Sequence, residues 1–143
     1  MEISQEQRQF LASHRLCVFG HNRRHGPPSL TPVYYFLDGD EIVISTTSSR
    51  GKAKAVRRNP EVTVCVLDEN PPFAYLTIFG HARVEAAGAV DVMMRVGEKM
   101  TGNAVAEAAR PALEERAKNE GRVVLRVRPA EIVWTQPLGR RSA

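Results

Sequence analysis

The chain has 143 residues, of which 43% are hydrophobic and 25% are charged, so we expect a single domain over residues 1–143 that buries its own core. It contains no apolar run of about 18 residues, which argues against a membrane-spanning helix. The formal net charge of +4 is mild and suits an anionic small molecule as well as a nucleic acid.

The start of the chain and its two cysteines indicate a cytoplasmic protein. The segment MEISQEQRQF lacks the basic region and apolar stretch of a secretory signal. Cys17 and Cys65 each lie among apolar neighbours. We therefore expect both to be reduced, buried thiols that pack as small apolar side chains. A disulfide between them is the less favoured alternative.

Hydrophobic periodicity and turn residues predict a mainly β chain with flanking helices. A helix is expected over residues 1–14 with Ser4 as its N-cap, and a second begins in SSRGKAKAVRR and stops at Asn59-Pro60. The expected strands span 15–20, 30–38, 41–47, 62–68, 73–86 and 122–137, and two further helices are expected within 88–120.

The links between these strands are short, which favours an antiparallel barrel over a parallel sheet. Asp38-Gly39-Asp40 predicts a hairpin turn. Gly80, inside a long strand, predicts a bulge or a close approach of two backbones. No alternation of strands and helices of the Rossmann type is present.

The segment most informative about function joins the strand EIVISTT to the helix that begins in SSRGKAK. A helix N-terminus offers free N–H groups and the positive end of the helix dipole to an anion. Arg50 adds a planar fork suited to phosphate oxygens, and Lys52 adds a point charge. Ser45 and Thr46 add hydroxyl donors, and Gly51 lets the backbone approach a ligand. These residues predict a phosphate site.

The same segment also fits an ordinary basic amphipathic helix with Ala53 and Val56 packed inward, and the residues alone leave both readings open. It is not a P-loop, because Ala53 stands where that motif requires Ser or Thr.

The strand LTPVYYFLD is a second candidate. Alternation places Thr31 and Val33 on one face and Leu30 and Pro32 on the other. A flat ring system needs an apolar wall and a few polar groups, which the main chain at residues 31–33 can offer. Tyrosines paired across strands in a half-buried sheet are the alternative reading.

Other residue types add no chemistry. The four histidines lack metal-ligand spacing and are expected on the surface or in loops. Acidic residues form no evident catalytic pair. The three methionines Met93, Met94 and Met100 lie on a predicted helix and are assigned to the core.

The order of the elements, together with the motifs LTPVYYFLD, SSRGKAKAVRRNP and FAYLTIFGHARV, resembles that of the pyridoxamine-phosphate-oxidase-like split-barrel flavoproteins. The chain looks most similar to the branch that uses the deazaflavin coenzyme F420, from about Leu11 to Val84 and again in the last strand. The resemblance implies a six-stranded antiparallel split β-barrel of the FMN-binding type, with an insert of helices at about 88–120.

The resemblance also implies a site. Ser45, Arg50 and Lys52 hold the cofactor phosphate, and the main chain of residues 30–33 faces the cofactor ring. The protein is a homodimer with the cofactor at the interface, where Phe73 and Tyr75 cover it from the other copy. The predicted cofactor-binding residues are therefore Leu30, Thr31, Pro32, Val33, Ser45, Thr46, Arg50, Gly51, Lys52, Phe73 and Tyr75, with no catalytic side chain and no metal ligand.

The implied function is that of an oxidoreductase, which binds coenzyme F420 and transfers hydride to a small conjugated or quinone-like substrate. The proton comes from solvent, Tyr35 or Tyr75. Two alternatives stay open: an FMN-dependent oxidase or reductase of the same fold, and a non-catalytic flavin-binding carrier or sensor. A nucleic-acid binder is disfavoured, because aromatic and basic residues are not interleaved on one strand face.

Overall fold

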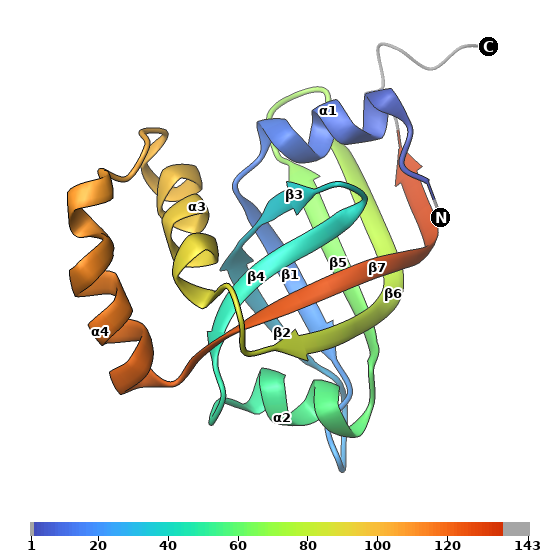
Figure 1. Ribbon diagram of the computed structural model, residues 1–143. Helices are drawn as coiled ribbons and strands as arrows, with labels where there is room; N and C mark the ends of the chain where they lie inside the picture. Colours follow the sequence, from blue (N-terminus) through green and yellow to red (C-terminus); the bar gives the residue numbers. More distant parts are fainter. Residues whose placement is uncertain (1, 136–143) are drawn as a thin grey trace.

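The computed structural model describes residues 2–135, which form a curled antiparallel sheet with a helix at each end and two helices along one side (Figure 1). The strands are β1 (Leu16–His21), β2 (Ser29–Tyr34), β3 (Phe36–Asp38), β4 (Glu41–Thr47), β5 (Glu61–Asp68), β6 (Ala74–Glu85) and β7 (Arg122–Thr135). The helices are α1 (Gln5–Ser13), α2 (Gly51–Arg58), α3 (Ala89–Thr101) and α4 (Arg110–Glu120), with a 3₁₀ turn at Glu107–Ala109.

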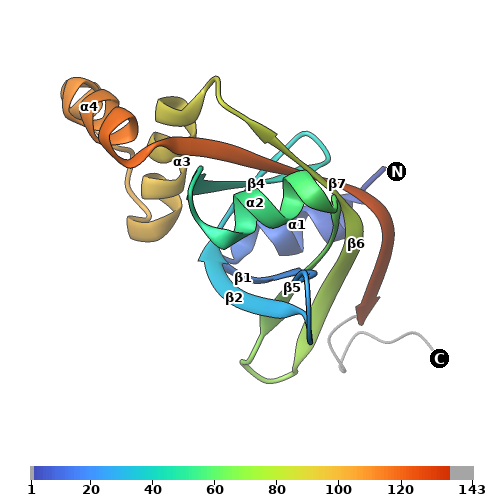
Figure 2. The ribbon, with the colours of Figure 1, turned by 90° about the horizontal axis from the view of Figure 1, so that it is seen from below.

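The strands follow the order β2-β1-β5-β6-β7-β4-β3, so β2 and β3 lie at opposite edges of the sheet although they are consecutive in the chain. Only Tyr35 separates them. The two edges must therefore come close together, and the sheet curls into an incompletely closed barrel (Figure 2). The split-barrel prediction is confirmed.

The structure has seven strands where six were predicted, because the predicted strand over 30–38 is interrupted at Tyr35. The ring of Tyr35 is fully buried, and its hydroxyl donates a hydrogen bond of 2.6 Å to the carbonyl of Leu11. This buried anchor turns the chain from one sheet edge to the other. Of the last predicted strand, positions 136–137 lie outside the described residues.

The inward side chains of the strands form the main core, which includes Phe19, Ile44, Val64, Leu76 and Leu125. Helix α1 covers one end of the barrel with the buried Leu11, and Ser4 forms the predicted cap as part of a capping box with Gln7. Helix α2 lies across the other end (Figure 2) and buries Ala53 and Val56.

Gly80 permits the close contact of β6 with β7 that its position predicted. A Cβ atom at this residue would clash with the carbonyl oxygen of Arg128. The register between the two strands also shifts here, between Phe79 and Gly80. The bulge bends two long strands, which lets the sheet curl.

His21 was expected on the surface, and that prediction is wrong. It is the last residue of β1 and is 9% exposed, with its ring centroid 6.1 Å from that of Phe19. Strand alternation places both side chains on the inner face, and the loop prediction failed because the strand extends one residue further than the sequence pattern indicated.

The outer face of the sheet has two regions, which we call the covered face and the open face, and they differ in what covers them. Phe36, Val43 and Val124 are buried beneath Val92 of α3. The open face is formed by β2, β1, β5, β6 and the end of β7. It carries exposed apolar side chains. Within residues 2–135, no helix is long and apolar enough to cross a membrane.

Candidate functional site

The predicted phosphate-binding segment lies at the end of the barrel that α2 covers. Strand β4 ends at Thr47, a short turn follows, and Arg50 caps α2 in an extended backbone conformation. The Arg50 side chain is exposed and makes no capping hydrogen bond, and the first helical turn contains no acidic residue. The helix therefore presents its N–H groups and positive dipole end without an internal counter-charge.

Lys52 lies beside Arg50 in the first turn of α2 and is half-buried. Burial of the ammonium lowers the pKa of Lys52, and the nearby positive charge of Arg50 lowers it further. Among residues 2–135, neither Arg50 nor Lys52 forms an ion pair with a carboxylate. An anion placed here would relieve the repulsion between two adjacent cations.

The other basic side chains of α2 are differently engaged. Arg57 donates to the hydroxyl of Ser48 at 3.2 Å and to its carbonyl at 3.4 Å, and Arg58 donates to the carbonyl of Asn22 at 3.3 Å. These hydrogen bonds connect the helix to neighbouring turns. Arg50 and Lys52, at the start of the helix, form no such hydrogen bonds within the described chain.

The hydroxyl residues of β4 point to opposite faces. Ser45 lies on the outer side with Val43 and lines a cavity of about 420 Å³ together with Val33 and Tyr34. Thr46 is 2% exposed and points inward with Ile44. At Gly51, a Cβ atom would meet nothing within 4 Å, so packing does not require glycine at this position.

The predicted ring-contacting residues lie on the edge strand β2. Thr31 and Val33 pair with the buried Phe19 and Cys17 and point inward, whereas Leu30 and Pro32 point outward. Since β2 pairs only with β1, one row of its main-chain groups has no partner in the sheet. That row is available to a ligand, except at Pro32, which has no N–H.

Phe73 and Tyr75 lie at the opposite end of the barrel, in and just after the turn between β5 and β6, whereas α2 lies at the other end (Figure 1). The centroids of their rings are 6.0 Å apart, and Phe73 is half exposed. Within one chain they do not share a site with Arg50. Their predicted role at the cofactor therefore stays a prediction that requires a second copy.

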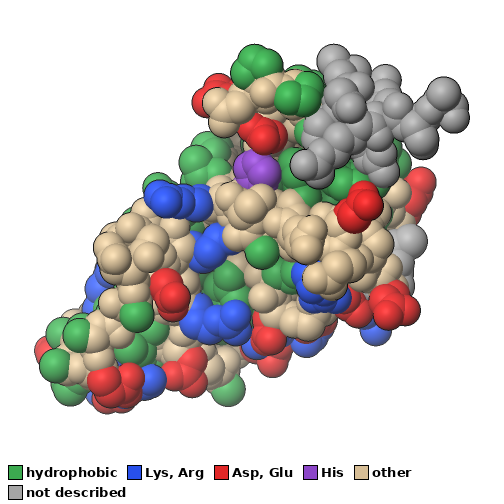
Figure 3. Space-filling model, turned by 90° about the horizontal axis from the view of Figure 1, so that it is seen from above, with side chains coloured by type: hydrophobic (Ala, Val, Ile, Leu, Met, Phe, Trp, Pro, Cys, Tyr) green, Lys and Arg blue, Asp and Glu red, His purple; other side chains and the backbone are tan. Residues whose placement is uncertain are grey.

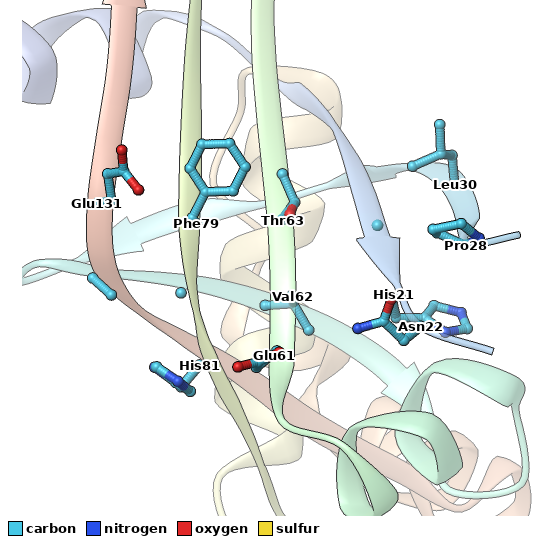
Figure 4. Close-up of a pocket in the computed structure, with 13 residues that line it drawn as sticks. His21, Asn22, Pro28, Leu30, Glu61, Val62, Thr63, Phe79, His81 and Glu131 are labelled. Atoms are coloured by element: carbon cyan, nitrogen blue, oxygen red, sulfur yellow. The ribbon is translucent and has the colours of Figure 1, made fainter. Parts of the chain in front are cut away.

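A shallow hollow of about 470 Å³ lies on the uncovered face of the sheet (Figure 4). The register places Leu30, Gly20, Thr63, Phe79 and Glu131 in one row across five strands. Sequence reasoning missed Phe79 and Thr63. The signal for Phe79 was the alternation in FAYLTIFGHARV, which leaves this apolar side chain on the outer face, and the alternation in VTVCVLD places Thr63 on the same face.

The cavity beside Ser45 was also missed. Its other wall comes from the predicted insert: Met93, Val96 and Met100 of α3, Val105 of the connecting segment, and Leu113 of α4. Met93 is buried, but Met100 is 48% exposed, so the core assignment of Met100 is wrong. A helical period cannot reveal a cavity whose opposite wall is a strand far away in sequence.

The comparisons with known proteins agree with this architecture. The sequence model of a family described as Pyridoxamine 5'-phosphate oxidase matches residues 3–135. No protein of curated function matches the chain.

Solved structures with the same fold cover nearly the whole chain. A conserved hypothetical protein, Rv2991 from Mycobacterium tuberculosis, is 22% identical with a TM-score of 0.84, over 99% of this chain and 91% of its own. A structure named F420 Reductase is 20% identical with a TM-score of 0.72, over 92% and 98%. The FAD binding protein from Mycobacterium smegmatis is 17% identical with a TM-score of 0.59, over 94% and 97%.

Proposed function

Since this chain belongs to the pyridoxamine 5'-phosphate oxidase family, we propose that it is an oxidoreductase that binds a phosphorylated flavin or deazaflavin at the N-terminus of α2. The observation that carries the proposal is the pair Arg50 and Lys52, two adjacent cations without a carboxylate partner in the described chain. A phosphate there would gain charge-assisted hydrogen bonds and the helix dipole.

The residues around this pair suit the rest of such a cofactor. Ser45 offers a hydroxyl on the outer side of β4, and the free edge of β2 offers main-chain groups beside Val33. We assign the phosphate to Ser45, Arg50 and Lys52, and the ring to the β2 edge. Gly51 and Thr46 belong to this segment, although Thr46 is buried and acts through the backbone.

We propose coenzyme F420 as the cofactor, with FMN as the alternative. The formal net charge of +4 suits the anionic tail of the deazaflavin. The structural neighbour named F420 Reductase aligns over nearly the whole length of both chains. FMN presents a monophosphate that the same pair would also hold. When bound, either cofactor supplies the hydride transfer, and the protein's task is to bind, orient and shield it.

The proposed assembly is a homodimer that uses the uncovered sheet face. Leu30 is 70% exposed there, and Phe79 and Val133 are each 41% exposed. Clustered apolar side chains of this kind mark an interaction surface. A second copy on this face would bury them, and it is the way in which Phe73 and Tyr75 can reach the site.

The proton in the proposed reduction does not come from Tyr35. Its hydroxyl is fully buried and already donates to the carbonyl of Leu11, and burial raises the pKa of Tyr35. Tyr75 is partly exposed, and solvent remains available at the surface. The substrate class we propose is a small conjugated or quinone-like molecule.

A cytoplasmic location fits the cysteines. Cys17 and Cys65 are free thiols, but Cys65 is only partly buried, because strand alternation turns its side chain to the outer face. Burial raises the pKa of Cys17 to about 12, which makes it unreactive. We propose a reducing compartment on this basis.

The test is a fluorescence titration of the purified, cofactor-free protein with coenzyme F420 and, separately, with FMN. Tight binding of F420 with weak binding of FMN supports the proposal, and the reverse preference supports the FMN-dependent alternative. Turnover of the reduced cofactor with a quinone such as menadione then distinguishes an enzyme from a carrier or sensor. Binding of neither cofactor would overturn the proposal.

A further inference from the structure

The cavity beneath the helical insert has the size and lining of a small-molecule site. It is open to solvent and spans about 420 Å³ between the outer side of the barrel and helices α3 and α4. Ligand sites in proteins typically span roughly 300–1,000 Å³ and are mostly apolar.

The apolar part of the cavity comes mainly from the insert. Val96 and Met100 of α3 face Leu113 of α4 across it, and Val105 lies between the helices. Ala117, at 9% exposed, is the one buried residue of α4, so most of this helix does not pack on the barrel. Seen from above, hydrophobic side chains appear among acidic ones at the α3–α4 end of the molecule (Figure 3).

The polar part of the cavity is cationic. Arg116 and Arg122 both line it, and their Nε atoms contact the same carboxylate, that of Glu120, at 2.9 Å and 2.6 Å. Two positive charges therefore share one negative charge. Each guanidinium retains two further nitrogen atoms that can bind a second carboxylate.

The cavity lies next to the proposed cofactor segment. Ser45 belongs to both, Thr47 pairs with Arg122, and the N–H of Ser48 donates to the carbonyl of Gly121 at 2.8 Å. A molecule in the cavity would thus lie beside a cofactor bound between β2, β4 and α2.

We propose that this cavity binds an apolar carboxylic acid, whose hydrocarbon or aromatic body lies among Val96, Met100 and Leu113 and whose carboxylate meets Arg116 and Arg122. The binding site stands on the cavity alone. Its role as the substrate site rests on the proposed function. Ser45 and Val33 line the cavity near the proposed cofactor site, whereas Val96, Met100 and Leu113 lie in the helical insert and form its apolar part.

The test is calorimetric titration of the full-length protein with two matched pairs: 1-naphthoate against 1-naphthylmethanol, and decanoate against decanol. At least one acid should bind about 10-fold or more tightly than its alcohol, as expected for a charge-assisted contact. The pair with the larger preference identifies an aromatic or an aliphatic body. Equal binding of acid and alcohol in both pairs, or no binding, overturns the inference.

Two variants and their controls locate the site. Leu113→Trp should fill the cavity and weaken binding of the acid at least about 10-fold, and Arg116→Gln should remove the preference for the acid over the alcohol. Ala112→Trp and Lys118→Gln, at exposed positions of α4 that do not line the cavity, should change neither quantity. Unchanged acid binding in Leu113→Trp overturns the inference.

The same samples separate this inference from the proposed function. Cofactor titration of Leu113→Trp should give the wild-type affinity, and Arg50→Ala should bind the acid normally while losing affinity for the cofactor. Acid binding without cofactor binding in the wild type would overturn the proposed function alone. Cofactor binding without acid binding would overturn the inference alone.

Discussion

The two outer faces of the sheet are built by the same alternation but meet different surroundings. On one face, Val43 and Val124 are at most 1% exposed, because α3 covers them. On the other, Leu30 and Phe79 have no helix above them and are 70% and 41% exposed. The chain covers the first face with its own insert, and we propose that a second copy covers the other. The insert leaves a cavity beside the barrel, and the open face leaves apolar side chains exposed.

The largest effect is expected from a charge on the open face. Phe79→Glu or Leu30→Glu should weaken the dimer by about 100-fold or more, because an unpaired carboxylate would be buried between the copies. Sedimentation at several concentrations measures this. Ala112→Glu on α4, outside the open face, should leave the dimer intact. A monomeric wild-type protein would contradict the proposed interface.

A core truncation tests the covered face. Val43→Ala should lower the free energy of unfolding by about 2 kcal/mol, because it removes fully buried methyl groups beneath α3. Urea unfolding in the monomeric Phe79→Glu background measures it. In the same background, Val133→Ala on the open face should cost less than about 0.5 kcal/mol. Equal costs at the two positions would show that the faces do not differ in burial.

The charge state of Lys52 predicts how cofactor affinity depends on pH. Its pKa lies below the ordinary 10.5, since burial and Arg50 disfavour the ammonium. Affinity for a phosphate should therefore fall, by about 10-fold, as pH rises through that lowered pKa. Lys52→Arg, which stays charged, should flatten the alkaline part of the curve. An equally steep fall in Lys52→Arg would exclude Lys52 as the titrating group.

The smallest effect is expected at the polar rim of the covered face. Hydrogen bonding from Arg83 lowers the pKa of Glu41, and the charges of Arg83 and Arg126 act in the same direction, against partial burial. The Glu41 carboxylate therefore stabilises the fold at pH values above its ordinary pKa of 4.5, and this contribution is lost as pH falls through the lowered pKa. Glu41→Gln should cost less than about 1 kcal/mol at pH 7.

Urea unfolding at pH 7 and pH 3 checks this sign. The difference between Glu41→Gln and wild type should shrink at pH 3. Glu115→Gln on α4 serves as the control and should show no difference at either pH, because Glu115 is exposed and forms no ion pair among the described residues. A difference that grows on acidification would contradict the assigned direction.

The fold could be predicted from the sequence because its signals are local. Alternation located the strands, Ser4 and the Asn59-Pro60 stop bounded the helices, and Gly80 marked the bulge. The break at Tyr35 could not be predicted, because it depends on a hydrogen bond to Leu11 and on β2 and β3 joining different edges. Those partners are set by the tertiary fold.

The candidate site was predictable to the extent that it is contiguous in the chain. Arg50 and Lys52 stand at one helix start, so their chemistry is visible in the sequence. The cavity is not visible, because it combines Ser45 of β4 with Leu113 and Arg122, which lie far from it in the sequence. The proposed approach of Phe73 to Arg50 requires a second copy of the chain, and the sequence of one chain does not show how two copies meet.

The most direct test of the account measures affinity for coenzyme F420 and FMN in Arg50→Ala, Lys52→Ala and the control Lys54→Ala, which removes an exposed charge from the same helix. Circular dichroism confirms that each variant folds. Each of the first two substitutions should lower the affinity for the preferred cofactor by about 10- to 150-fold, the range for a lost charge-assisted contact. Lys54→Ala should leave that affinity nearly unchanged. Wild-type affinity in both Arg50→Ala and Lys52→Ala would contradict the claim that this pair holds the cofactor phosphate.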